Sequence, residues 1–315
     1  MSDNSSKNFQ SQSDEIDILE IFLIIKKKYK FILIITLLSI IFSSVYALRM
    51  PNMYLASSVL SSANEQKSLS SQYSSLAAVA GIKIGSDEIS KTKEALKIIR
   101  SLHFFKSHIY PFINLENLFA VKYVNLDSNI ITYDDKLFDS KNKLWVKNDM
   151  YEWVPSKRYN IQPSPQSAYE IFSSIFGIKE DDDGFVILSL QHQSPLIAKT
   201  WLDMSIAAIN SSILEEDKTN ALNSIRYLEE SLVAANLSQV KDAISNLLEQ
   251  EIKKITFINA SDEYVFKIID PPVVPEEKFK PSRFIIVITA TFLGFLLSIL
   301  VVIFQNYFLI NKLSK

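Results

Sequence analysis

The 315-residue chain has no cysteine and only five glycines. Without cysteine it cannot form a disulfide, a thiolate zinc site or a cysteine nucleophile. The glycine spacings match neither G-x-x-x-x-G-K-[ST] nor G-x-G-x-x-G, so neither nucleotide-binding motif is present. The five glycines are Gly81, Gly85, Gly177, Gly184 and Gly294. A net charge of −2 offers no basic surface of the kind that nucleic-acid-binding domains carry. We therefore expect no cofactor and no nucleic-acid partner.

Long charge-free apolar runs are present, in contrast, at residues 31–48 and 284–304. As helices they would be about 27 and 32 Å long, close to the thickness of a bilayer core. Polar residues precede the first run and no cleavage site follows it, which favours a transmembrane helix over a signal peptide. Lysines within residues 26–30 precede the first span and only Arg49 follows it directly, so the positive-inside rule predicts a cytoplasmic N-terminus.

This orientation predicts cytoplasmic segments at residues 1–30 and 305–315, with residues 49–283 outside the inner membrane. Lysines and an arginine at 278, 280 and 283 flank the second span on its outer side, and they fit the rule less well. We follow the first span because it usually dominates topology. The segment DEIDILEIFLIIKKKYK has apolar residues at helical spacing and predicts an interfacial helix that leads into the first span.

The longest periodic region predicts a helix over about 195–235, with Ser194 as its cap and Pro195 at its first position. At roughly 60 Å it is too long to be buried in a domain of this size. It should project and pack against copies of the chain or another partner, as in a coiled coil. A second helix is expected from about Ser238 to Phe257, with Asn236 and Gln239 resembling a capping box.

Three segments have strand patterns, at residues 54–62, 185–191 and 262–270. Pairing of the first and last strands, together with the middle one, predicts a small membrane-proximal sheet. Periodicity also predicts helices over 89–109 and 164–178, whereas the region between them reads as irregular with short strands. The expected fold class is an α+β domain, a small sheet with long projecting helices, between two transmembrane helices.

Few residues suggest chemistry, and we predict that the chain is not an enzyme. His103 and His108 are five positions apart, which fails the zinc spacing of H-E-x-x-H. His192, at the end of a strand, could act as a base, but a surface or packing role is favoured. The acidic run Glu180–Gly184 could bind a cation, but a solvated hairpin turn is favoured. No metal, cofactor or catalytic residue is therefore assigned.

Aromatic residues could stack on sugars or fill the core. Trp201 lies among apolar helical neighbours, which favours the core. Trp145 is a further candidate for stacking, and Trp153 and Tyr151 fit either role. Along the long helix, charged residues alternate with apolar residues that share one face. Because of the helix length we predict that this face contacts other subunits, through Ala221, Leu222, Ile225 and Leu228.

The order of these segments resembles the polysaccharide co-polymerases, the Wzz-type chain-length determinants of Gram-negative bacteria. Each stretch is weak alone, but seven in family order between two spans make a strong pattern. They are DEIDILEIF, SSLAAVAGI, KTKEALKIIRSLHFF, PSPQSAYEIF, HQSPLIAKTWLDMSIAAIN, ALNSIRYLEESL and YVFKIIDPPVVPEEKFKPSR. With only a short tail after the second span and no phosphate loop, the resemblance is to the class without a kinase.

The resemblance maps the family's proline-rich motif onto residues 270–283, with Pro271, Pro272, Pro275 and Pro281, and leaves Gly294 as the one glycine of the second span. Because proline fixes φ and favours an extended backbone, we expect a semi-rigid strut rather than a flexible linker.

The resemblance implies a homo-oligomer in the inner membrane that sets the modal length of a lipid-linked polysaccharide, the lipopolysaccharide O-antigen, together with a Wzy-type polymerase. It could act as a ruler or as a scaffold. The alternatives are a capsule or exopolysaccharide co-polymerase or export component, a two-span periplasmic sensor and, least favoured, a membrane-anchored enzyme.

Overall fold

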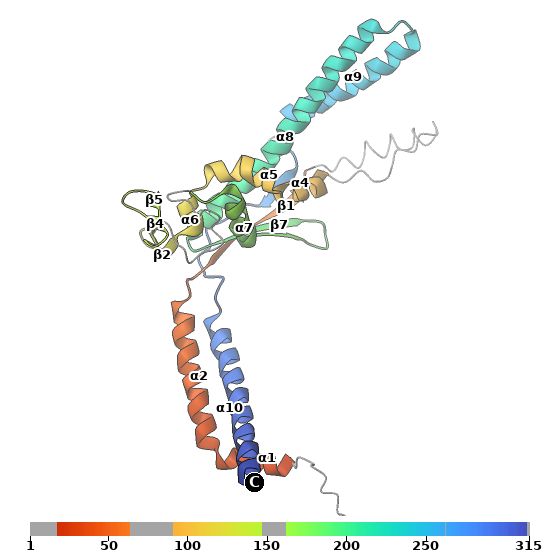
Figure 1. Cartoon of the computed structure of the whole chain (residues 1–315). Helices are drawn as coiled ribbons and strands as arrows, with labels where there is room; N and C mark the ends of the chain where they lie inside the picture. Colours follow the sequence, from red (N-terminus) through yellow and green to blue (C-terminus); the bar gives the residue numbers. More distant parts are fainter. Residues whose placement is uncertain (1–17, 64–90, 147–161, 262, 314–315) are drawn as a thin grey trace, which may run out of the picture. The chain divides into compact units, whose positions relative to one another are not determined.

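The computed structural model describes residues 18–63, 91–146, 162–261 and 263–313. It divides into two compact units (Figure 1). The terminal unit contains Met1–Met50 and Pro281–Lys315, and the central unit contains Pro51–Lys280. The predicted α+β class is confirmed, with long helices in the central unit and two apolar helices in the terminal unit.

The terminal unit consists of helices, α1 (Ile18–Lys27), α2 (Tyr29–Arg49) and α10 (Arg283–Leu313). By length and composition, all of α2 and the Arg283–Asn306 part of α10 could each cross a membrane. Most of their side chains are exposed within the unit, as expected for helices that face lipid rather than a protein core.

An antiparallel four-stranded sheet organises the central unit, in the order β6-β7-β1-β8. The strands are β1 (Tyr54–Ser62), β6 (Phe176–Glu180), β7 (Val186–His192) and β8 (Phe266–Asp270). As predicted, β1, β7 and β8 share one sheet, and the structure places β1 between the other two. Alternate residues of β7 are buried, so one face of the sheet lies on the core.

The expected helix over 164–178 is too long by three residues. Helix α7 (Pro165–Ile175) begins after its Ser164 cap, at the expected start, but ends at Ile175, and β6 follows at once. Gly177 allows β6 to approach β7, because a Cβ there would lie 2.4 Å from the Ser189 Oγ. Pairing with β7 therefore overrides the helical periodicity of this segment.

Helix α8 (Pro195–Ala234) covers the buried face of the sheet with its first half. Its Ser194 cap accepts a hydrogen bond from the Ile197 backbone N–H, as the sequence indicates. The buried residues of this half recur every three or four positions, as a helix face on a core requires. They include Ala198, Trp201, Leu202, Ile206, Ile209 and Ile213.

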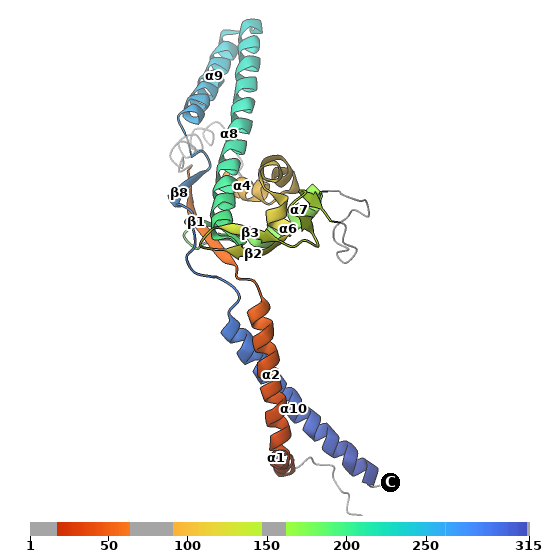
Figure 2. The same ribbon diagram turned by 90° about the vertical axis from the view of Figure 1, so that its left-hand side faces the viewer.

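Beyond this core, α8 continues and α9 (Ser238–Asn259) returns alongside it as a helical hairpin (Figures 1 and 2). Partly or fully buried residues of α9 recur at helical spacing, at Ile244, Leu248, Ile255 and Ile258. The predicted capping box is wrong: the cap of α9 is Leu237, and no side chain caps the helix.

The expected helix over 89–109 is broken. Helix α4 (Lys91–Ile99) stops before Ser101, which is extended and whose hydroxyl accepts a hydrogen bond from the Phe104 N–H. A short helix and a π-helical turn, η1 (Phe105–Ile109), follow. The remaining short elements are α5 (Leu102–Phe104), η2 (Tyr110–Phe112), α6 (Leu115–Phe119), β2 (Val121–Asn125), β3 (Ile130–Tyr133), β4 (Phe138–Asp139) and β5 (Leu144–Trp145).

Candidate functional site

The α8–α9 hairpin exposes several large apolar side chains. Leu222 is 50% exposed, Tyr227 70% and Val233 87%, and Leu247 and Ile252 on α9 are each 49% exposed. Such side chains along two packed helices are suited to bind a partner.

The four helix residues predicted to face other subunits differ in accessibility. Ala221 is only 1% exposed within the single chain, so its side chain is already covered before any partner binds. Ile225 and Leu228 lie one and two turns further along the same face and are partly buried, whereas Leu222 is open. Contact with another subunit through this face stays a prediction, and Leu222 is its most accessible member.

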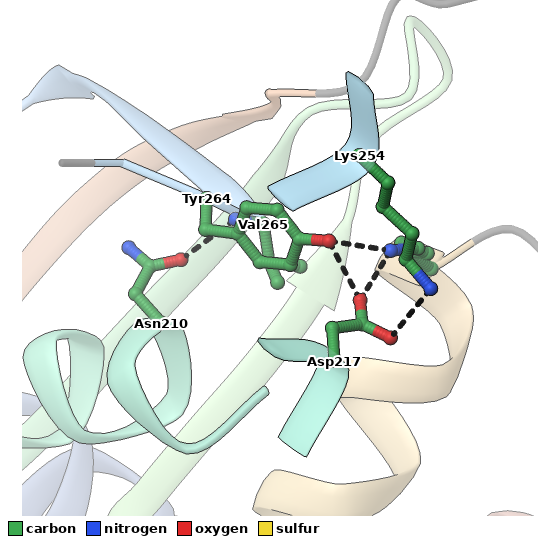
Figure 3. Close-up of polar contacts among 6 residues, drawn as sticks. Asn210, Asp217, Lys254, Tyr264 and Val265 are labelled. Atoms are coloured by element: carbon green, nitrogen blue, oxygen red, sulfur yellow. Dashed lines mark hydrogen bonds and ion pairs between the residues drawn. The ribbon is translucent and has the colours of Figure 1, made fainter. Parts of the chain in front are cut away.

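At the root of the hairpin, charged and phenolic side chains from distant segments meet (Figure 3). The Tyr264 hydroxyl donates to the Asp217 carboxylate over 2.7 Å, and Lys91 Nζ donates to the Tyr264 oxygen over 2.8 Å. Lys91 also pairs with Asp217 directly, and Lys254 Nζ lies 3.8 Å from the other carboxylate oxygen. This Asp217 cluster (Lys91, Asp217, Lys254 and Tyr264) joins α4, α8, α9 and the segment before β8.

Opposing effects set the pKa values in the Asp217 cluster. Burial acts to raise the pKa of Asp217, but hydrogen bonds from Lys91 and Tyr264 and the nearby lysine charges together outweigh it, so this pKa lies below its usual value. Burial, and then the Asp217 carboxylate, raise the pKa of Tyr264. The cluster therefore holds an ionised carboxylate against a protonated phenol.

Two turns before Asp217, the buried side chain of Asn210 binds the backbone at the start of β8 (Figure 3). Its Oδ1 accepts from the N–H groups of Val265 and Phe266 over 3.1 and 2.8 Å. Its Nδ2 donates to the Phe266 carbonyl over 3.0 Å. Asn210 thus satisfies three backbone groups and fixes α8 to the sheet edge. Sequence reasoning missed Asn210 and Asp217, although polar residues on an otherwise apolar face were a usable signal.

The proline-rich segment is held at both ends by the same strand region. The Ser58 hydroxyl on β1 donates to the Asp270 carbonyl over 2.7 Å. Met53, just before β1, exchanges backbone hydrogen bonds with Phe279 and Lys280, at 2.8 Å and 2.9 Å. Residues 271–279 between these anchors form neither helix nor strand.

Within this segment Pro271 is exposed, Pro272 is buried and Pro275 is partly buried. Pro281 belongs to the terminal unit. Because φ is fixed at each proline and the two ends are anchored, the segment has few ways to move. The predicted strut role remains a hypothesis, and these anchors are the features that support it.

Gly294 brings the two long helices of the terminal unit together. A Cβ at Gly294 would lie 2.4 Å from the Ser39 Oγ and 2.6 Å from the Ser39 Cβ. The Ser39 hydroxyl also donates to the Ala290 carbonyl over 2.8 Å. Ser43 on α2 and Ser298 on α10 are also buried. Small residues at a close helix crossing are typical of transmembrane pairs.

The histidines have no catalytic arrangement among the described residues. His192 is buried, its Nε2 donates to the Asn117 carbonyl over 2.8 Å, and its Nδ1 accepts from the Ser194 N–H over 2.9 Å. Burial lowers the pKa of His192, and these two hydrogen bonds oppose the change. Of the two favoured roles, at the surface or in packing, the structure therefore shows packing. His103 is exposed, and His108 stacks on Phe104 with ring centroids 5.0 Å apart.

The acidic run forms the β6–β7 hairpin turn, as favoured. Asp181 accepts from the backbone N–H groups of Asp183 and Phe185, and Gly184 has a φ of +85°. Within the part of the chain that the structure describes, no three His, Cys, Asp or Glu side chains gather as a metal site.

The tryptophans differ in environment. Trp201 is buried in the core, 5.2 Å from the His192 ring, as predicted. Trp145 is partly buried and packs edge-to-face on Phe138, with ring centroids 5.1 Å apart. Trp153 and Tyr151 lie outside the described residues.

Comparison with known proteins identifies the family from two segments. A family model described as "Chain length determinant protein" matches residues 14–107, and one described as "G-rich domain on putative tyrosine kinase" matches residues 238–307. The chain belongs to the polysaccharide co-polymerase family. The two matches cover about half of this co-polymerase, and Gly294 is the one glycine within the G-rich match.

Two solved structures that are similar to this chain are polysaccharide co-polymerases by their descriptions. A full-length bacterial polysaccharide co-polymerase is 11% identical, with 95% of this chain and all of the other covered, at a TM-score of 0.39. A WzzB fragment from Salmonella Typhimurium is also 11% identical, with 73% and 100% covered, at a TM-score of 0.29. The search of curated proteins gave no match.

Proposed function

We propose that this chain regulates the modal chain length of a lipid-linked cell-surface polysaccharide, the lipopolysaccharide O-antigen. It acts as a homo-oligomer in the bacterial inner membrane, together with a Wzy-type polymerase, and catalyses no covalent step itself. The observation that carries the proposal is the match to the chain length determinant family at residues 14–107, in a chain with two helices able to span a membrane.

The proposed topology places residues 1–30 and 305–315 in the cytoplasm, spans at 31–48 and 284–304, and residues 49–283 in the periplasm. The positive charge before the first span supports this orientation. In this arrangement the α8–α9 hairpin, with its exposed apolar residues, is available to neighbouring subunits, to the polymerase and to the glycan.

The test is deletion of the gene, followed by electrophoresis of the lipopolysaccharide. We expect the modal band to disappear and to return when the wild-type gene is supplied on a plasmid. An unchanged lipopolysaccharide ladder with an altered capsule or exopolysaccharide would reassign the polymer. A strain in which no polysaccharide changes in length would contradict chain-length control and favour a sensor.

Self-association is tested separately, by the mass of the detergent-extracted complex. Leu222→Glu places a charge on an exposed apolar position of α8, and we expect the complex to dissociate to smaller species. Asn223→Glu adds the same charge at the next, also exposed, position and serves as the matched control. A wild-type chain that runs as a monomer would contradict the oligomer.

A further inference from the structure

A cavity of about 370 Å³ opens in the central unit between α4, η1, α7 and β6. This volume falls within the range of small-molecule pockets in proteins. The apolar part of its wall includes Ile99, Phe104, Phe105, Ile109, Phe172 and Phe176. Of these, all but Phe176 are buried in the fold, so the wall is fixed by the core.

Aromatic contacts make this wall rigid. The Phe105 and Phe172 ring centroids are 5.2 Å apart, and Phe172 stacks on Phe176 at 5.5 Å. Phe105 begins the π-helical turn η1, in which the Tyr110 N–H bonds to the Phe105 carbonyl. π-Helical turns are rare and occur frequently at functional sites. The cavity and this unusual turn are independent features that coincide.

The polar groups around the cavity are few, and the hydroxyls are already engaged. Ser205 donates to the Trp201 carbonyl over 2.7 Å, and Ser173 donates to the Glu170 carbonyl over 3.0 Å. A sugar ring needs several hydrogen-bond partners, and these walls supply too few. An apolar chain matches the walls better.

One cation stands at the rim. The exposed Arg100 guanidinium, which has five N–H donors, donates one to the Ile178 carbonyl at 3.5 Å. The Tyr169 hydroxyl donates to the Arg100 carbonyl over 2.5 Å and fixes the backbone at this point. A positive charge at the mouth of an apolar cavity is complementary to a ligand with an apolar chain and an anionic head.

We propose that this cavity binds an anionic amphiphile, with its apolar chain against Phe104, Phe105 and Phe172 and its carboxylate or phosphate at Arg100. At roughly 30 Å³ for each water-sized group, the cavity holds on the order of a dozen carbon atoms. This binding proposal does not depend on the proposed role in polysaccharide chain length, and a separate experiment tests it.

The test uses the full-length chain in amphipol and a 12-carbon fatty acid that carries a photoreactive diazirine on its chain. We expect cross-links in peptides that contain residues 99–109 and 169–178. Ser173→Trp fills the mouth and should abolish labelling there. Ser174→Trp is the matched control, because Ser174 is also exposed and does not line the cavity.

The charge at the mouth is tested with Arg100→Gln, which should weaken probe binding about tenfold. Lys97→Gln, on α4 three residues before Arg100 and outside the cavity lining, should leave binding unchanged. Dodecanoate and dodecyl phosphate should both compete with the probe, and the stronger competitor identifies the head group. Dodecanol should compete at least tenfold more weakly, and inorganic phosphate should not compete.

Three results would overturn the proposal. Labelling confined to other regions would show that the cavity is not the site. Equal labelling of the Ser173→Trp and Ser174→Trp variants, each folded by circular dichroism, would show that the mouth is not the entrance. Competition by dodecanol equal to that of dodecyl phosphate would show that the anion is not recognised.

Discussion

Replacing Asn210 by leucine is the sharpest test of how α8 is joined to the sheet. Leucine has nearly the same volume, so the change removes hydrogen bonds without opening a cavity. It leaves the Val265 N–H, the Phe266 N–H and the Phe266 carbonyl without their Asn210 partner. Each buried polar group left unpaired costs about 1–3 kcal/mol, which gives about 3–9 kcal/mol for three. Burial of the leucine offsets about 2 kcal/mol, so we expect a net loss of roughly 1–7 kcal/mol.

Hydrogen exchange of the full-length protein in detergent, read by mass spectrometry, measures this loss locally. Amides of β8 should exchange at least about fivefold faster in the Asn210→Leu variant, because every 1.4 kcal/mol is a factor of ten. Amides of β6, at the opposite edge of the sheet, provide an internal reference. Asn223→Leu makes the same substitution at an exposed position of α8 and should change stability by less than about 0.5 kcal/mol.

The reasoning would be refuted by unchanged protection of β8 in the Asn210→Leu variant. It would also fail if the Asn223→Leu variant lost as much protection, because the effect would then come from an added apolar residue on α8 rather than from the lost amide.

Two further predictions follow from the Asp217 cluster and from the terminal unit. The pKa of Asp217 lies below its ordinary value, so its contribution to stability is present above the unfolded pKa of about 3.9 and is lost as the pH falls through the folded pKa. Asp217→Asn should therefore lower the thermal midpoint above pH 5 and flatten its decline between pH 5 and 3, and an identical decline in both proteins would contradict this. Gly294→Leu should destabilise the α2–α10 pair by about 1–3 kcal/mol in detergent, because its side chain meets Ser39. Thr289→Leu, at an exposed position of α10, should not, and an equal effect of both would argue against the close contact.

Much of the fold could be predicted from the sequence because it depends on local signals. The start of α8 follows from a serine cap and a proline at the first position, and both are observed. β1 and β7 follow from runs of strand-forming residues, and their pairing follows from the need to bury one face. The two long apolar helices follow from length and the absence of charge.

The elements that were missed are set by tertiary contacts. Phe176–Glu180 continues a helical pattern, and only pairing with β7 makes it a strand. The cap at Leu237 lacks a side-chain hydrogen bond, so no residue type could signal it. The roles of Asn210 and Asp217 depend on segments about 50 residues away, and their spacing on α8 indicates only a polar interruption of an apolar face.

The length of α8 suggested that it needs other subunits to be stable, and the structure changes that argument. The first half of α8 is buried on the sheet, and the second half packs on α9 within the same chain. The Asp217 cluster lies between these halves and also reaches α4 and the segment before β8. The direction of the hairpin is therefore set within one chain, before any assembly. The exposed apolar side chains of the hairpin, Leu222 and Val233 among them, are not covered within the described chain. A contact between subunits would add stability at these side chains.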